Sequence, residues 1–135
     1  LGYCRALDEA GIPIDQGLVL EGDFSGESAV ARINELVASG REFTAVFAMN
    51  DTMAFGARLS LSRHGLSVPG DVSIIGFDDQ MESAFMTPPL TSIRQPAREM
   101  GRSAADAVLT MIDGEAVEST RVQAELVQRE SVQSR

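Results

Sequence analysis

The segment from Thr44 to Asp79 constrains the fold most, because it contains two buried-strand patterns separated by one helix pattern. Thr44–Met49 (TAVFAM) and Val72–Phe77 (VSIIGF) are short apolar runs, typical of strands covered by helices on both faces. Residues 52–63 between them carry small apolar side chains at helical spacing. A strand, a helix and a strand in this order form a parallel βαβ unit, so the sequence predicts an α/β fold.

A pair of polar residues follows each of the two strands: Asn50 with Asp51, and Asp78 with Asp79. In an open parallel sheet both pairs would lie at the carboxyl edge, where ligands bind in the crevice beyond the strand ends. Asn and Asp are also favoured helix caps, so Asn50 or Asp51 could instead cap the following helix, and we expect Asp79 to cap the segment that begins at Gln80. The sequence therefore predicts a binding site at this edge, with a capping role as the structural alternative.

The rest of the chain continues the alternation of helices and strands, which predicts a doubly wound, mostly parallel sheet. Ser25 or Ser28 is expected to cap the second helix, and the polar residues after Arg129 are expected to fray. The further helices are predicted at Leu1–Ala10, from the serine cap to Gly40, briefly at Gln80–Met86 and at Pro96–Ile112, and the further strands at Gly17–Gly22, Leu90–Gln95 and Thr120–Val127.

Charge and residue usage exclude several function classes. The 135-residue chain has a net charge of -9 and scattered arginines, so it is not expected to bind nucleic acid by itself. All its basic residues are Arg, and the absence of lysine excludes P-loop phosphate binding and Schiff-base chemistry. One Cys and one His cannot form a Cys/His zinc site. No apolar run approaches the roughly 18 residues of a membrane span. We expect a cytoplasmic domain with no cofactor, metal or membrane partner.

Three linked motifs carry a family resemblance: AVFAMNDTMAFGA at residues 45–57, VPGDVSIIGFDD at residues 68–79 and PPLTSIRQP at residues 88–96. In this order and spacing they resemble the effector-binding core of the LacI/GalR family of transcription regulators. Members have a DNA-binding headpiece and two α/β subdomains, of the periplasmic-binding-protein-like fold, that clamp a sugar or a purine.

The resemblance also implies how the chain divides. Residues 1–90 and 120–130 would belong to the C-terminal subdomain, and residues 91–114 would form the crossover segment and a helix of the N-terminal subdomain. The helix pattern begins at Leu1 without a cap, so residues upstream are expected, and the headpiece has no counterpart in this chain. DNA would be bound only through that headpiece.

The resemblance assigns effector contacts to Asn50, Asp78 and Gln95, while Asp51 is assigned to structure. The amide of Asn50 both donates and accepts, which suits vicinal hydroxyl groups. The carboxylate of Asp78 can accept two hydroxyl hydrogen bonds or one from a purine ring N–H. Gln95 would act at the crossover between subdomains, and a solvated position before Pro96 is its structural alternative.

The resemblance further implies a homodimer formed through residues 52–63 and 80–86, whose apolar groups would face a partner. The helix at Pro96–Ile112 packs on the N-terminal subdomain in the family, so in this chain we expect it to fold back on the sheet or to dock on a second copy. The predicted interface residues are Met53, Phe55, Met81, Phe85 and Met86.

The sequence therefore predicts a non-enzymatic effector-sensing and dimerisation domain of a LacI/GalR-type regulator. A periplasmic sugar-binding protein is the first alternative, because it has the same fold. The second is an enzyme or phospho-acceptor in which Asp51, Asp78 and Asp79 hold Mg²⁺ through oxygen ligands. A receiver-type phospho-acceptor also needs a lysine, which the chain lacks.

Overall fold

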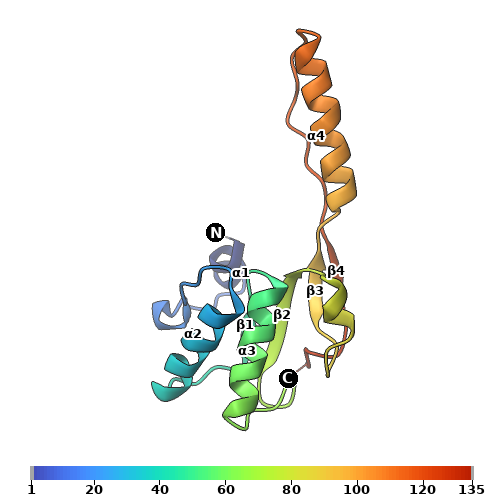
Figure 1. Ribbon diagram of the computed structural model, residues 1–135. Coiled ribbons are helices and arrows are strands. Elements are labelled where there is room, and N and C mark those ends of the chain that lie inside the picture. Colours follow the sequence, from blue (N-terminus) through green and yellow to red (C-terminus); the bar gives the residue numbers. More distant parts are fainter. Residues whose placement is uncertain (1, 135) are drawn as a thin grey trace.

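Residues 2–134, which the computed structural model describes, include one four-stranded sheet. The strands lie in the order β1 (Ala45–Phe47), β2 (Ser73–Asp78), β3 (Thr91–Arg94) and β4 (Glu125–Val127). β1, β2 and β3 are parallel, and β4 is antiparallel to β3 (Figure 1). The predicted α/β fold with a mostly parallel sheet is confirmed.

The helices α2 (Gly26–Ala38) and α3 (Asp51–Arg63) pack closely against each other, and α3 packs on β1 and β2 (Figure 1). Ser25 caps α2 by accepting a hydrogen bond from the backbone N–H of Ser28, as predicted. The close approach depends on Gly56, because a Cβ there would collide with the backbone of Gly26. The helical segments are α1 (Gly2–Glu9), η1 (Gln16–Leu18), α2 (Gly26–Ala38), α3 (Asp51–Arg63), η2 (Met81–Ala84) and α4 (Ala97–Ile112).

The hydrophobic core lies between the sheet and these two helices, and it fixes α3 against the sheet. Leu61 and Ala54 of α3 are 0% exposed, and Ile74 of β2 is 1% exposed. The small side chains predicted on this helix bring its first turn close to the carboxyl ends of the strands. The core therefore sets the distance between α3 and the candidate edge.

Two predicted strands differ most from the structure, whereas the bounds of the other three differ by one or two residues at each end. Gly17–Gly22 is not a strand: η1 occupies its start, Asp15 caps η1, and Val19 and Leu20 are exposed. A strand needs a neighbour for its backbone hydrogen bonds, and this segment pairs with none of the described strands. Thr120–Val127 was predicted too long, because only Glu125–Val127 pairs with β3.

The strand β1 is less buried than its apolar sequence predicts. Ala45 and Phe47 are exposed and Val46 is half-buried. β1 lies at the edge of the described sheet, and α3 packs on one of its faces. The prediction that helices cover both faces is wrong for β1.

Residues 130–133 are held in place by hydrogen bonds, so the predicted fraying after Arg129 is wrong for this part of the tail, while residue 135 lies outside the described residues. Ser131 is 2% exposed, and its carbonyl accepts a hydrogen bond from Ile74 N at 2.8 Å. Its hydroxyl donates to the Ile74 carbonyl at 2.6 Å and accepts from Thr91 N at 2.8 Å. A polar residue therefore links β2 to the start of β3 from inside the fold.

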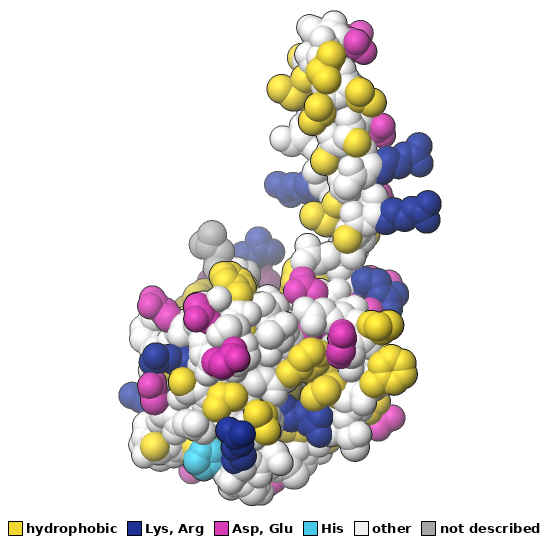
Figure 2. Space-filling model, viewed as in Figure 1, with side chains coloured by type: hydrophobic (Ala, Val, Ile, Leu, Met, Phe, Trp, Pro, Cys, Tyr) yellow, Lys and Arg dark blue, Asp and Glu magenta, His cyan; other side chains and the backbone are white. Residues whose placement is uncertain are grey.

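The helix α4 projects from the rest of the molecule, and residues 113–124 run back beside it to β4 (Figure 1). We call α4 with residues 113–124 the arm and the remaining described residues the body. No residue of α4 is buried, so the prediction that this helix folds back on the sheet is wrong. Hydrophobic side chains lie along the arm surface (Figure 2). None of the helices in the described part of the chain is both long and apolar enough to cross a membrane.

Candidate functional site

The candidate site lies where β2 and β3 end at the carboxyl edge of the sheet. Asp78 is the last residue of β2 and pairs with Arg94, so Gln95 follows directly on the neighbouring strand. The Gln95 Nε2 donates a hydrogen bond to Asp78 Oδ1 at 2.6 Å, and both residues are half-buried. The structure therefore brings together two of the three residues predicted to contact an effector.

Asn50 begins α3 at the same edge, but its hydrogen bonds go elsewhere. Its Oδ1 accepts from Met53 N at 2.7 Å, which caps α3, and its Nδ2 donates to the Phe24 carbonyl at 3.0 Å. The capping alternative is thus confirmed for Asn50. Its contact with an effector stays a prediction, as do those of Asp78 and Gln95.

Two consecutive residues with positive φ form the corner that ends β2. Asp78 has a φ of 108° and Asp79 a φ of 54°, a region that side chains other than glycine rarely adopt. Such a conformation persists where surrounding contacts hold it, and it is frequent at binding sites. The side chain of Asp78 contacts Gln95, whereas that of Asp79 contacts Arg94 and Arg129.

Asp79 forms a buried ion pair rather than the predicted cap. Its side chain is 6% exposed, with Oδ1 at 2.6 Å from Arg129 Nη2 and Oδ2 at 2.7 Å from Arg94 Nη2. Burial alone would raise the pKa of Asp79, but the hydrogen bonds and charges of Arg129 and Arg94 outweigh it and lower the pKa. η2 begins after Gln80 without a side-chain cap, so the predicted cap is wrong.

Asp51 has the structural role assigned to it, in a form that the sequence did not indicate. It is 0% exposed, and its carboxylate accepts hydrogen bonds from Gln80 N at 2.8 Å, Ser83 Oγ at 2.5 Å and Ser92 Oγ at 2.6 Å. These donors come from the β2–η2 corner, from η2 and from β3. No local sequence pattern links residues so far apart in the chain.

The three aspartates of the alternative magnesium site do not converge. Asp51 binds hydroxyl and amide donors, Asp78 binds Gln95, and Asp79 binds two arginines. Within residues 2–134 there is no group of three or more His, Cys, Asp or Glu residues placed to hold a metal ion.

The predicted dimer residues divide into two groups. Met81 and Phe85, at η2, are 76% and 80% exposed. Met53 and Phe55, on α3, are half-buried and pack against the core. Met86 is also half-buried. The most exposed apolar groups of this set therefore lie on η2 and directly after it, and the interface stays a prediction.

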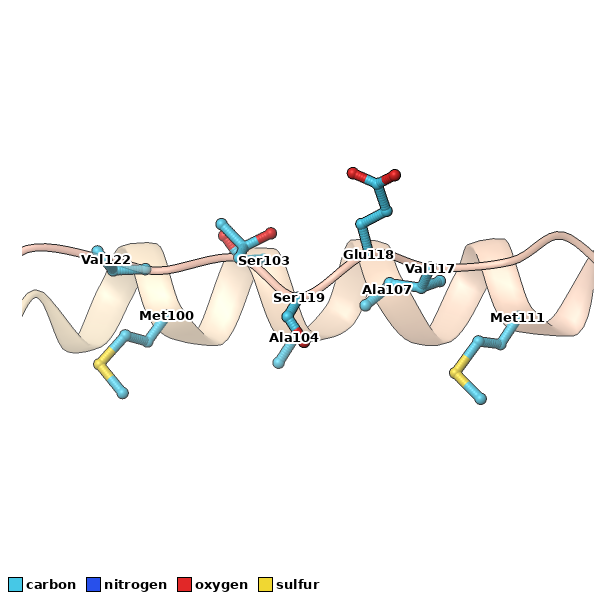
Figure 3. Close-up of a pocket in the computed structure, with 10 residues that line it drawn as sticks. Met100, Ser103, Ala104, Ala107, Met111, Val117, Glu118, Ser119 and Val122 are labelled. Carbon is cyan, nitrogen blue, oxygen red and sulfur yellow. The ribbon is translucent and has the colours of Figure 1, made fainter.

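A shallow hollow on the arm lies apart from the candidate site. Residues of α4 and of the returning segment line it, and Figure 3 shows Met100 and Met111 extending to the same side of the helix. None of the predicted effector residues lines this hollow. Its apolar side chains belong to the exposed face of the arm.

An open, mostly parallel sheet with polar side chains at its carboxyl edge is the architecture of ligand-binding α/β domains. The chain belongs to the periplasmic binding protein-like domain family, whose sequence profile matches residues 1–132.

The more specific resemblance to LacI-type regulators is confirmed by individual relatives. The transcriptional repressor PurR of Vibrio campbellii is 39% identical over 133 residues, which are 97% of this chain and 40% of that relative. The chain thus spans about 40% of the length of the curated relatives that it matches. These relatives are transcriptional repressors, which are not enzymes.

Solved structures give the same result. A sugar-binding transcriptional regulator of the LacI family from Escherichia coli, complexed with phosphate, has a TM-score of 0.89 and 32% identity, covering 97% of this chain and 48% of that chain. The lac repressor dimer bound to operator and the anti-inducer ONPF has a TM-score of 0.88 and 31% identity, covering 98% of this chain and 46% of that chain.

Proposed function

We propose that this chain is the effector-sensing and dimerisation part of a LacI/GalR-type transcriptional regulator. The observation that carries the proposal is the contact between Asp78 and Gln95, which joins two neighbouring strand ends at the carboxyl edge. Relatives that are repressors, and a LacI-family neighbour that is sugar-binding, support it. DNA contact is proposed only through a headpiece outside this chain, and a cytoplasmic location belongs to the same proposal.

The proposed ligand is a sugar or a purine, because both present hydroxyl or N–H donors to a carboxylate. Gln95 uses one oxygen of Asp78, so the second oxygen is the acceptor that we assign to the ligand. Gln95 has an amide oxygen that can accept from the same ligand. Asn50 would contribute by exchanging its hydrogen bond to the Phe24 carbonyl for one to the ligand.

We also propose the division into subdomains that the resemblance implies. Residues 1–90 and 120–130 would form the C-terminal subdomain, and residues 91–114 would cross to the N-terminal one. The arm supports this, because it begins at Ala97, two residues after Gln95, and carries an exposed apolar face. A ligand held between the subdomains would shift the population of the closed form by its differential affinity for the two forms.

A thermal-shift screen of the full-length regulator against monosaccharides, disaccharides and purine bases tests the ligand. A compound present at 100 times its dissociation constant stabilises a domain by about 2.7 kcal/mol. Asp78→Ala should abolish this shift and Gln95→Ala should reduce it, whereas Asp8→Ala, which alters an exposed carboxylate on α1, should not. An unchanged shift in Asp78→Ala would contradict the assignment.

The proposed homodimer uses the exposed apolar groups at η2 together with α3. Phe85→Glu should convert the dimer to a monomer in sedimentation velocity, because it places a charge on a side chain that is 80% exposed. Phe24→Glu is the matched control, with the same substitution at a side chain that is 66% exposed before α2. A dimer that survives Phe85→Glu would exclude this interface.

A further inference from the structure

The buried carboxylate of Asp51 is surrounded by hydrogen-bond donors near the carboxyl edge of the sheet. It accepts hydrogen bonds from Gln80 N, Ser83 Oγ and Ser92 Oγ, at 2.8, 2.5 and 2.6 Å. A Cβ on Gly76 would collide with Asp51 Oδ1, so glycine leaves the space that the carboxylate occupies. Three elements beyond α3 thus meet at one side chain, which lies at the first residue of α3.

A second connection runs from Asp51 to the corner through Ser92. The backbone N–H of Asp79 donates to Ser92 Oγ at 3.1 Å, and Ser92 Oγ donates to Asp51 Oδ1 at 2.6 Å. Asp51 therefore holds two successive amides of the corner, that of Gln80 directly and that of Asp79 through the hydroxyl. These amides follow Asp78, whose φ of 108° needs such support.

The chemistry of the site requires a carboxylate rather than an amide. A carboxylate accepts at both oxygens, which suits three donors. In Asp51→Asn one of the two carboxylate oxygens becomes an NH2 group. If the NH2 group points to Ser92, the hydroxyl proton of Ser92 loses its acceptor. If it points to Ser83 and the Gln80 backbone N–H, it faces an N–H group that can only donate. A buried polar group left unpaired in this way destabilises the arrangement around it.

We propose that Asp51 is a positioning residue with two separable effects. Through Ser92 and the Gln80 amide it fixes the corner so that Asp78 faces the ligand, and through Ser83 it fixes the base of η2. The part concerning the ligand rests on the proposed function, whereas the part concerning the corner and η2 does not. Asp51 itself is not assigned any contact with the ligand.

Two serine variants separate these effects, and a third serine is the control. Ser92→Ala removes the connection to the Asp79 amide, and Ser83→Ala removes the connection to η2. Ser60→Ala is matched, because Ser60 is also 0% exposed and donates to the Asn34 Oδ1 at 2.7 Å, at the α2–α3 contact. Each variant deletes one buried hydroxyl from the same body.

Amide hydrogen exchange measured by NMR reads out the positions of these effects. In Ser92→Ala the Asp79 amide should exchange about tenfold faster or more, relative to core amides of the same variant. In Ser83→Ala the backbone amides of residue 83 and of Phe85, both in the η2 region, should exchange faster. Ser60→Ala should leave the exchange rates of the corner amide and of the η2 amides unchanged, and Asp51→Asn should raise both. The serine variants decide the question if Asp51→Asn does not fold.

The proposal is overturned if the Asp79 amide of Ser92→Ala exchanges as it does in Ser60→Ala. Binding adds a second readout: any sugar or purine that stabilises the wild type should bind Ser92→Ala about tenfold more weakly and Ser60→Ala unchanged. Equal binding despite faster exchange would overturn the part concerning the ligand. If no compound stabilises the wild type, the proposed function fails, while the exchange rates still decide the positioning role.

Discussion

The body and the arm use similar amino acids in opposite ways. In the body, Leu61 is 0% exposed and Ile74 is 1% exposed. In the arm, Leu109 is 60% exposed and Ile112 is 74% exposed, and no residue of α4 is buried. The body therefore has its own hydrophobic core, whereas the arm presents apolar side chains that nothing in the described chain covers. In proteins most of the stability of a helix comes from the packing of its apolar face rather than from helical propensity, so the exposed face leaves α4 without its main source of stability.

One ion pair of the body and one of the arm also differ in burial. In the body, Asp79 is paired with Arg129 at 2.6 Å, and the two side chains are 6% and 17% exposed. In the arm, Arg102 and Asp106 lie 3.8 Å apart, with exposures of 85% and 69%. Exposed pairs of this kind contribute little, whereas breaking a buried pair leaves a charge without its partner. The body should therefore respond strongly to single substitutions and the arm weakly.

The largest effect should come from Leu61→Ala, which removes a fully buried side chain from the core between α3 and the sheet. Substitutions of this kind cost about 2–5 kcal/mol, because transfer free energy is lost and a cavity remains. The free energy of unfolding, measured by urea denaturation, should fall by an amount in the upper half of that range. A loss of unfolding free energy below about 0.5 kcal/mol, as expected for the arm, would contradict the difference in packing between body and arm.

Asp79→Asn should have the next largest effect, because it leaves Arg129 without its carboxylate. We expect a loss of about 3 kcal/mol in the same assay, the lower end for a buried pair, since Arg129 is still 17% exposed. Arg94→Ala is the internal comparison, with a smaller expected loss, because Arg94 is 49% exposed. Equal losses in the two variants would show that Arg129 has no special part in the pair.

The pH dependence of stability sharpens this second prediction. The pKa of Asp79 is lowered below its ordinary value of 3.8, so the unfolded chain binds the proton first as the pH falls. The contribution of the ion pair is complete above about pH 4 and is lost as the pH falls from there through the lowered pKa. The Asp79→Asn variant should lack this part of the loss. Asp23 titrates in the same acidic range, because the Ser25 and Ser28 hydroxyls lower its pKa to about 2, so part of the slope should remain.

The difference between the two regions also explains what the sequence could predict. The βαβ unit followed from local periodicity, because buried strands and an amphipathic helix have distinct patterns over a few residues. The position of Asp78 at the carboxyl edge of the sheet followed from the parallel βαβ unit, whereas its contact with Gln95 was seen only in the structure. Asp79 escaped this reasoning, because Arg94 and Arg129 lie 15 and 50 residues away in the chain.

The missed features share this dependence on distant contacts. Ser131 looked like part of a polar tail, yet its hydroxyl and carbonyl bind Ile74, 57 residues earlier. Asp51 looked like a cap, because hydrogen bonds to serines on other elements leave no local signal. For the arm, the apolar stripe predicted that a face of α4 needs a cover, but a periodic pattern does not say where that cover lies.

Asn50→Ala should destabilise the body by about 1 kcal/mol, because it removes the side chain that caps α3. α4 begins at Ala97, and Pro96 before it provides no side-chain cap, so the two helices differ in this respect as well. Asn50→Asp is the control that keeps a capping oxygen while losing the donor to the Phe24 carbonyl. It should lower the melting temperature less than Asn50→Ala. The reverse order would assign the stability to the Phe24 contact.

The smallest effect should come from Ile112→Ala in the arm, where the free energy of unfolding should fall by less than about 0.5 kcal/mol, because the side chain is already 74% exposed and little buried area is lost.

The same lack of packing should make the arm the first site of proteolysis. Trypsin cleaves only after arginine in this lysine-free chain, so it should cleave at Arg121, in the exposed returning segment, before it cleaves at Arg129, whose guanidinium binds Asp79. Protection of Arg121 from trypsin at concentrations where the chain is a dimer would show that a second copy covers the arm. A loss of stability in Ile112→Ala comparable to that in Leu61→Ala would show that the apolar face of the arm is packed in solution.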